Sequence, residues 1–250
     1  MSEKSLRIAL LGFGRMGRLI EDLAIKQGHQ VTAKVSRSNP LQPSALLAAD
    51  VAIEFSSPKV AENLCLQALS LGIPTVSGST GWDTSPLKEK VMSQRLPAFL
   101  HSTNMSIGVN AVFAANALLA RVLAKAQVLD PAFKIQAKIS ETHHTHKLDQ
   151  PSGTAITLAE GLIQNLPGYQ SWSLEPTVIA LPVTSLREGE VIGTHQIKLE
   201  TPYESISLRH EASSRNGFAL GAILAAKFIH DQRPGRVYEM VDALELGPLT

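Results

Sequence analysis

The sequence contains a single cysteine, Cys65, so no disulfide bond can form within the chain. Paired thiols are what small secreted domains use for stability, and their absence gives no indication of secretion. Cys65 lies in ENLCLQALSLG, an apolar and helix-like segment. A buried thiol in such a segment is inert, so we expect a structural role and no nucleophile here.

A strong net charge is also lacking. The chain of 250 residues has 23 lysines and arginines against 22 aspartates and glutamates, a formal net charge of +1. Nucleic acids and anionic membranes attract clustered basic residues, so we expect neither as a partner. The N-terminal apolar run is too short for a signal peptide, and no segment approaches the roughly 20 apolar residues of a membrane-spanning helix. We expect a cytoplasmic protein.

The first hundred residues alternate short apolar runs with amphipathic stretches. Strands are predicted at residues 6–12, 30–36, 50–56, 74–78 and 96–102. Helices are predicted at 15–28, from an N-cap at Ser57 and a first helical residue at Pro58 to residue 72, and after Thr84. This alternation is typical of an α/β fold with a doubly wound parallel sheet of the Rossmann type.

The pattern changes after Asn104. Helices are predicted at 106–126 and 154–166, and strands at 133–141, 177–185, 190–200 and 204–212. Consecutive strands without helices between them predict an α+β domain with an open mixed sheet that is largely antiparallel. A last helix at 216–230 is expected to return to the first domain. We therefore predict two domains, residues 1–104 with 217–250 and residues 105–216.

A glycine-rich turn, GFGRMG, directly follows the first predicted strand and precedes the first predicted helix. In a dinucleotide-binding turn, Gly12 would permit the tight bend, Gly14 the approach of a pyrophosphate, and Gly17 the close packing of helix on strand. The N-terminus of the helix, at Arg15 and Met16, would offer N–H groups to the phosphates. An ordinary glycine-rich turn is the alternative, but the strand–turn–helix context favours a nicotinamide dinucleotide.

No carboxylate follows the second predicted strand, where an NAD site usually has one for the ribose hydroxyl. The chain has KVSRS there instead. Arg37 can pair with a 2′-phosphate, whereas a carboxylate would repel it. We therefore expect NADPH to be preferred and NADH to be the poorer cofactor. A solvated arginine in a turn is the alternative.

The segment ETHHTHKLDQPSGTA, residues 141–155, brings His143, His144, His146 and Lys147 within five positions. Histidine exchanges protons near neutral pH, and lysine adds a permanent positive charge. The following SGT begins a predicted helix, where N–H groups and hydroxyls can bind a carboxylate. This combination suits a small doubly anionic substrate.

Two other interpretations of this segment stay open from the residues alone. Clustered histidines are common metal ligands, although the adjacent Lys147 disfavours a dication and we expect no metal. A structural loop with solvated histidines is the other interpretation.

The same segment closely resembles the signature of the 4-hydroxy-tetrahydrodipicolinate reductases, also called dihydrodipicolinate reductases, of the diaminopimelate route to lysine. The resemblance continues in GFGRMG, GSTGW, TNMSIGVN, REGEVIGTHQI and HEASSRNGFALGA, which occur in that order. It implies a Rossmann-type cofactor domain, a substrate domain whose open sheet builds a homotetramer, and NAD(P)H-dependent reduction of 4-hydroxy-tetrahydrodipicolinate.

The resemblance also implies residue roles. His143 would be the proton donor and Lys147 its catalytic partner, which also contacts the substrate. His144, Gly153 and Thr154 would bind the substrate. Besides the glycine turn and Arg37, the cofactor would contact Gly78, Ser79 and Thr80 on its nicotinamide side and Ser102, Thr103, Asn104 and Met105 in a segment that closes over it. This chain departs from the family in having a shorter glycine turn and methionine after Asn104, where an aromatic residue is frequent.

Two further functions compete with this one. The first is an NAD(P)-dependent amino-acid or semialdehyde dehydrogenase, which has no evident need for the anion-binding arrangement of residues 143–154. The second is a catalytically silent NAD(P)-binding sensor, which would have no use for a proton donor.

Overall fold

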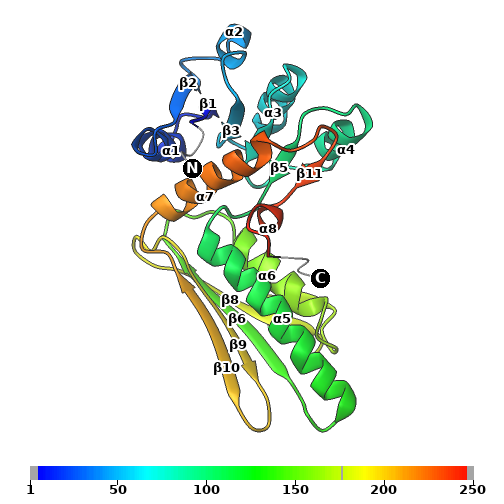
Figure 1. Cartoon of the computed structure of the whole chain (residues 1–250). Coiled ribbons are helices and arrows are strands. Elements are labelled where there is room, and N and C mark those ends of the chain that lie inside the picture. Colours follow the sequence, from blue (N-terminus) through cyan, green and yellow to red (C-terminus); the bar gives the residue numbers. More distant parts are fainter. Residues whose placement is uncertain (1–4, 176, 247–250) are drawn as a thin grey trace. The chain divides into compact units, whose positions relative to one another are not determined.

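The computed structural model describes residues 5–175 and 177–246, which form two compact units (Figure 1). The described residues of the first unit are 5–107 and 215–245, and those of the second are 108–175, 177–214 and Leu246. The domain limits predicted from the sequence, 104 and 217, differ from these by a few residues.

The first unit contains a six-stranded sheet in the order β11-β5-β4-β3-β1-β2. All neighbouring strands are parallel, which confirms the predicted Rossmann-type sheet. The central strands β3 and β4 are buried along their whole length because both faces of the sheet are covered. The strands are β1 Arg7–Leu11, β2 Gln30–Val35, β3 Val51–Glu54, β4 Thr75–Ser77, β5 Phe99–His101 and β11 Val237–Tyr238. The edge strand β11 has only two residues, too few for a recognisable pattern.

Helices pack on both faces of this sheet. On one face, α1 (Arg15–Lys26) and α7 (Asn216–His230) bury Ile8 and Leu10 of β1, together with Met240 of α8 (Met240–Ala243). The other face carries α2 (Pro43–Leu46), α3 (Ala61–Ser70) and α4 (Ser85–Ser93). The alternation of side chains along β1 therefore places successive residues in different clusters.

The start predicted for the helix after β3, at Ser57 and Pro58, is wrong. Helix α3 begins at Ala61, and its N-cap residue Val60 makes no side-chain capping bond. The carbonyl oxygen of Ser57 accepts hydrogen bonds from the N–H groups of Val60 and Ala61, which closes a separate turn before the helix. Cys65 in α3 is fully buried, as expected, and burial raises the pKa of its thiol well above the usual value.

The second unit has a five-stranded sheet in the order β10-β9-β6-β8-β7. The pairs β10–β9 and β9–β6 are antiparallel, whereas β6–β8 and β8–β7 are parallel. A mixed sheet is confirmed, but the expectation that it is largely antiparallel is wrong because α6 carries the chain back between β6 and β8. The elements are α5 Ile107–Leu129, β6 Gln136–His143, α6 Gly153–Ile163, β7 Ser171–Ser173, β8 Ala180–Arg187, β9 Thr194–Glu200 and β10 Ser205–Glu211.

Helices α5 and α6 lie along one face of this sheet (Figure 1). The 23 residues of α5 are long and apolar enough to cross a membrane, by length and composition only. The expectation that no segment approaches this limit is therefore wrong. Val109, Phe113, Ala120 and Leu123 of α5 pack into the core of the unit, which accounts for its apolar character as that of a core helix.

Candidate active site

The glycine turn joins β1 to α1 at the carboxyl edge of the parallel sheet. Gly12 has φ +116°, and a Cβ atom there would lie 2.1 Å from the carbonyl oxygen of Phe55. A Cβ atom on Gly17 would lie 2.3 Å from the carbonyl oxygen of Gly12. Both positions therefore require glycine on steric grounds. Gly14 is the N-cap residue of α1, with no atom near the place of a Cβ, so the backbone there is open to a ligand.

A cavity of about 620 Å³ opens beside this turn, at the ends of β1, β2 and β3. Gly12, Gly14 and Arg37 are among its lining residues, and Arg37 is the only charged one among the described residues that line it. Its other lining residues are Phe13, Val35, Ser36, Pro40, Leu41, Phe55, Ser56, Ser57, Val60, Asn63, Leu64 and Gln67. A glycine cradle, a helix N-terminus and a neighbouring arginine fit a phosphorylated dinucleotide.

A buried carboxylate, Glu54, organises two loops next to this cavity. Its Oε1 atom accepts hydrogen bonds from Ser56 N (2.7 Å), Ser56 Oγ (2.5 Å) and Ser79 Oγ (2.7 Å). Its Oε2 atom accepts one from Ser77 Oγ (2.6 Å). Ser56 lines the cavity, so Glu54 connects its wall to the loop after β4. Sequence reasoning missed Glu54 because a carboxylate at a strand end usually faces water.

The other predicted cofactor residues lie outside the lining of the cavity. Arg15, Met16 and Gly17 form the first turn of α1. A Cβ atom on Gly78 would lie 2.2 Å from the Phe55 ring. Ser79 is buried and its hydroxyl donates to Glu54, whereas Thr80 is exposed.

The segment 102–105 is held by its own hydrogen bonds. Ser102 Oγ donates to the carbonyl oxygen of Asn104 at 2.8 Å, and Asn104 Oδ1 accepts from the N–H of Ser106 at 2.8 Å. Thr103 lies within this turn. The Met105 side chain is only 2% exposed and packs in the core of the first unit. Met105 is therefore a core side chain, and it is not available to stack on a cofactor.

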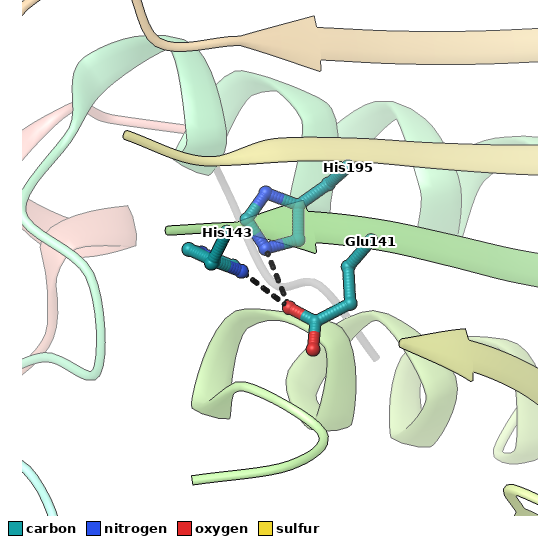
Figure 2. A group of neighbouring side chains, drawn as sticks. All are labelled: Glu141, His143 and His195. Carbon is teal, nitrogen blue, oxygen red and sulfur yellow. Dashed lines mark ion pairs between the residues drawn. The ribbon is translucent and has the colours of Figure 1, made fainter. Parts of the chain in front are cut away.

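In the second unit, the register of three strands brings polar side chains together around Glu141 of β6. Glu141 pairs with His195 of β9 on one side and with Ser185 of β8 on the other. His143, two residues further along β6, lies on the same face of the sheet. Figure 2 shows that both imidazole rings direct a nitrogen toward the same oxygen of Glu141.

Glu141 is fully buried yet surrounded by donors. Its Oε1 atom accepts hydrogen bonds from Ser152 N (3.0 Å) and Ser185 Oγ (2.5 Å), and the Arg187 guanidinium lies 3.3 Å away. Its Oε2 atom lies 2.8 Å from Nδ1 of His143. Burial alone would raise the pKa of Glu141, but the donors, first among them His143, hold it far below its usual range. Glu141 is therefore a permanent anion.

His195 is the second buried histidine of this cluster. Its Nε2 atom lies 3.7 Å from Glu141 Oε2 and 3.1 Å from Ser152 Oγ. Burial, reinforced by the nearby charges of His143 and other cationic groups, lowers the pKa of His195 to about 3. His195 is therefore neutral at physiological pH and is able to accept a hydrogen bond from Ser152.

The histidines and the lysine of residues 143–147 differ in burial and in their partners. His143 is buried, His144 is half-buried, and His146 is exposed beside Glu190 at 3.8 Å. The ammonium group of Lys147 pairs with Asp149 at 2.7 Å. Arg187 also donates to the carbonyl oxygens of Lys147 and Asp149, and so packs this loop against β8.

Helix α6 begins directly after this loop. Ser152 is its N-cap residue, and Ser152 Oγ accepts a hydrogen bond from the N–H of Ala155 at 3.2 Å. Gly153 and Thr154 are the first two residues of the helix. The predicted anion-binding turn thus coincides with a true helix N-terminus, and Ser152 N–H anchors it to Glu141.

Glu141, His143 and His195 could also hold a metal ion, because one ligand atom from each lies within 4.8 Å of the others. The charges nearby argue against it. Arg187 lies 3.3 Å from Glu141 and places a positive charge beside the carboxylate that would bind the ion. A dication would have to overcome this repulsion.

Sequence reasoning identified His143 but missed the residues that surround it: Glu141, Ser185, Arg187, Gly193 and His195. The motif REGEVIGTH contains Arg187, Gly193 and His195, and was recognised only as part of a resemblance. A glutamate at the end of a predicted strand, two residues before a histidine, was the one local signal for the pair.

Comparisons with known proteins cover nearly the whole chain. The dihydrodipicolinate reductase family matches it with its N-terminal part over residues 6–105 and its C-terminal part over residues 108–244. The 4-hydroxy-tetrahydrodipicolinate reductase of Christiangramia forsetii is 36% identical over 241 residues, which are 96% of this chain and 98% of the relative. That of Methanopyrus kandleri is 37% identical over 210 residues, which are 81% and 74% of the two chains.

Solved structures agree on the fold. A dipicolinate-bound dihydrodipicolinate reductase from Paenisporosarcina sp. TG-14 matches with a TM-score of 0.75 and 19% identity, over 96% of this chain and 99% of the other. Aspartate semialdehyde dehydrogenase II of Vibrio cholerae matches with a TM-score of 0.53 and 9% identity, over 91% and 99%. At these identities the likeness shows the fold alone.

Proposed function

This chain belongs to the dihydrodipicolinate reductase family, and from that membership we propose that it reduces 4-hydroxy-tetrahydrodipicolinate to tetrahydrodipicolinate with a nicotinamide cofactor, in the diaminopimelate route to lysine. The observation that carries the proposal is that one carboxylate, Glu141, contacts both His143 Nδ1 at 2.8 Å and Ser152 N–H, at the N-terminus of α6, at 3.0 Å. This arrangement combines a proton donor with binding groups for an anionic substrate.

Each part of the site has a role in this reaction. A bound reduced nicotinamide supplies the hydride. Lys147, His144 and the N-terminus of α6 at Gly153 and Thr154 hold the carboxylates of the substrate and offset their charge. His143 donates the proton that the reduced ring requires, a contribution of about 10²–10⁴-fold for a well-placed acid.

We assign cofactor binding to the first unit. The glycine turn, Arg37 and the cavity beside them would hold the adenosine and pyrophosphate portions. We further assign the nicotinamide side to the loop after β4 and the segment after β5. The proposed contacts are Gly12, Gly14, Arg15, Met16, Gly17, Arg37, Gly78, Ser79, Thr80, Ser102, Thr103, Asn104 and Met105, the last through its backbone.

NADPH is the preferred cofactor in this proposal. Arg37 is the one charged residue among the described lining residues, and no carboxylate there would repel a 2′-phosphate. NADH, which lacks that phosphate, would bind without this ion pair.

We also propose a cytoplasmic homotetramer. The support is the family membership and the face of the second sheet opposite α5 and α6, where outward residues such as Thr184 and Leu186 are exposed. Light scattering coupled to size exclusion measures the assembly, and a monomer at micromolar concentration would contradict this part of the proposal.

A coupled assay tests the reaction itself. The unstable substrate is generated in place from pyruvate and aspartate semialdehyde by its synthase, and loss of reduced-nicotinamide absorbance is followed with NADPH and NADH in parallel. Turnover that requires the synthase and is faster with NADPH is the expected result. Tight cofactor binding without turnover would favour a silent sensor, and oxidation that needs only aspartate semialdehyde would favour a semialdehyde dehydrogenase.

A further inference from the structure

We propose that Glu141 is the positioning residue of the proton donor: its Oε2 atom accepts Nδ1–H of His143, so that the doubly protonated ring gives its second proton to the substrate from Nε2 and is left neutral with the proton on Nδ1. The inference rests on the proposed function for the role of His143. The side-chain arrangement stands independently of the reaction, because it follows from strand register within one unit.

The geometry defines which nitrogen faces the carboxylate. Glu141 and His143 are two residues apart on β6, so their side chains share a face, and Nδ1 lies 2.8 Å from Oε2. The remaining nitrogen, Nε2, is on the opposite edge of the ring and points away from the carboxylate (Figure 2). A carboxylate next to Nδ1 favours the tautomer of the neutral ring in which Nδ1 carries the proton, and it also fixes the orientation of the ring.

Glu141 remains able to accept this hydrogen bond because it stays ionised. Ser152 N–H and the Ser185 hydroxyl occupy its other oxygen, and Arg187 supplies a positive charge at 3.3 Å. These three donors come from the N-cap of α6 and from β8, so the carboxylate is held in one orientation from two sides. A fixed anion of this kind also stabilises the positive charge of a protonated imidazole.

Gly193 completes the arrangement at the other nitrogen. A Cβ atom at this position would lie 3.0 Å from Nε2 of His143 and 3.3 Å from Cδ2. Its φ does not lie in the region that favours glycine, so the backbone conformation alone gives no reason for glycine there. The missing side chain leaves room at Nε2, the atom that must approach the substrate.

The same carboxylate anchors the substrate-binding turn. Ser152 N–H donates to Oε1 while Nδ1 of His143 approaches Oε2, so one side chain holds both the proton donor and the start of α6. His195, the other titratable group at Oε2, has a pKa lowered to about 3 by burial and nearby positive charge. It therefore does not compete with His143 for the charge of Glu141 near neutral pH.

The first test needs no substrate. In protein labelled with ¹⁵N-histidine, the nitrogen resonances of His143 are assigned by comparison with His143→Gln, and their chemical shifts report which nitrogen carries the proton. We expect protonation at Nδ1 in the neutral ring. A neutral ring protonated only at Nε2 would overturn the proposal, whether or not the enzyme turns over the predicted substrate.

The second test uses Glu141→Gln, which keeps the size of the side chain but removes its charge. We expect kcat to fall by about 10²-fold or more with a much smaller change in KM, because the proton transfer belongs to the transition state. We also expect the ¹⁵N shifts of His143 to change. Glu190→Gln is the matched control, since it removes an exposed histidine–glutamate pair with His146 and should leave kcat and the His143 shifts unchanged.

Two results would overturn the proposal. One is wild-type kcat in folded Glu141→Gln protein. The other is stoichiometric Zn²⁺ binding to the wild-type protein that is lost in both Glu141→Gln and His195→Gln, because Nδ1 would then be a metal ligand. Failure of the wild-type protein to turn over the substrate refutes the proposed function, while the tautomer measurement still decides the role of Glu141.

Discussion

Gly221 of α7 lies directly against the backbone of Met105, so close that a Cβ atom would stand 1.7 Å from the Met105 carbonyl oxygen. The two residues are far apart in the chain, and both are buried in the first unit. The contact holds the end of the segment 102–105, which we assign to the cofactor site, against the returning helix.

The contact predicts that Gly221→Ala destabilises the first unit. The added methyl group has no room beside a backbone oxygen, so we expect a loss of about 3 kcal/mol of unfolding free energy, the upper part of the range for overpacking. Urea titration measures the change. Gly217→Ala is the control, because it lies on the same helix with no atom near its Cβ position, and a similar loss there would contradict the steric explanation.

Replacement of Glu54 by Gln should weaken cofactor binding and stability together. The amide keeps one acceptor oxygen, but its NH₂ group faces a serine hydroxyl that now donates to the carboxylate, so we expect a loss of about 1–3 kcal/mol in unfolding free energy. Because Ser56 lines the cavity, the dissociation constant for NADPH should rise several-fold. Nucleotide fluorescence measures this constant. Glu89→Gln, exposed on α4, should change neither quantity.

Replacement of Arg37 by Ala should weaken NADPH selectively. Loss of a charge-assisted contact to the 2′-phosphate corresponds to about 1.5–3 kcal/mol, which is a tenfold or larger rise in the dissociation constant for NADPH. The constant for NADH should stay near its original value. Equal losses for both cofactors would show that Arg37 does not read the phosphate. Arg233→Ala, an exposed arginine of the same unit, is the control.

The proposed roles of His143 and Lys147 predict different kinetic effects. His143→Gln removes the proton donor, so kcat should fall by about 10²–10⁴-fold with little change in KM. Lys147→Ala removes a substrate contact as well as a charge, so kcat should fall and KM should rise. Steady-state kinetics with the coupled assay separates them, and a KM effect alone for His143→Gln would contradict its assignment.

The buried His195 predicts acid sensitivity of the fold. Its pKa of about 3 in the folded protein lies below the usual 6.5, so the unfolded chain binds this proton first as the pH falls. Stability should therefore decrease as the pH falls below 6.5 and stop changing near pH 3. From pH 7 to pH 5 the expected loss from this group is about 2 kcal/mol.

Other groups extend the same trend. Burial also lowers the pKa values of His101 and His210, which adds to the loss below pH 6.5. The lowered pKa of Glu141 stabilises the fold above its unfolded value of 4.5, and this stabilisation disappears as the pH falls below that value. Urea titrations across pH measure the effect. His195→Gln should flatten the curve between pH 7 and pH 5, and parallel curves would refute the assignment.

Local patterns in the sequence were sufficient to predict most of the secondary structure of the first unit. The alternation of apolar runs with amphipathic stretches predicted its parallel sheet, and the spacing of Gly12, Gly14 and Gly17 placed the turn between β1 and α1. These signals are readable because hydrophobic periodicity and glycine geometry act over a few residues. The edge strand β11 was not predicted because its two residues form a strand only by pairing with β5, which is distant in the chain.

The sequence by itself determined the alternation of elements, the glycine turn, and the joint presence of histidines, a lysine and a helix start in residues 143–154. Only the tertiary structure decided that β8 runs parallel to β6, and that Glu141 lies between His195 and Ser185 and faces His143. The physical reason is that these contacts depend on strand register. Register is set by the packing of the whole sheet against α5 and α6, and it brings together residues that no local pattern relates.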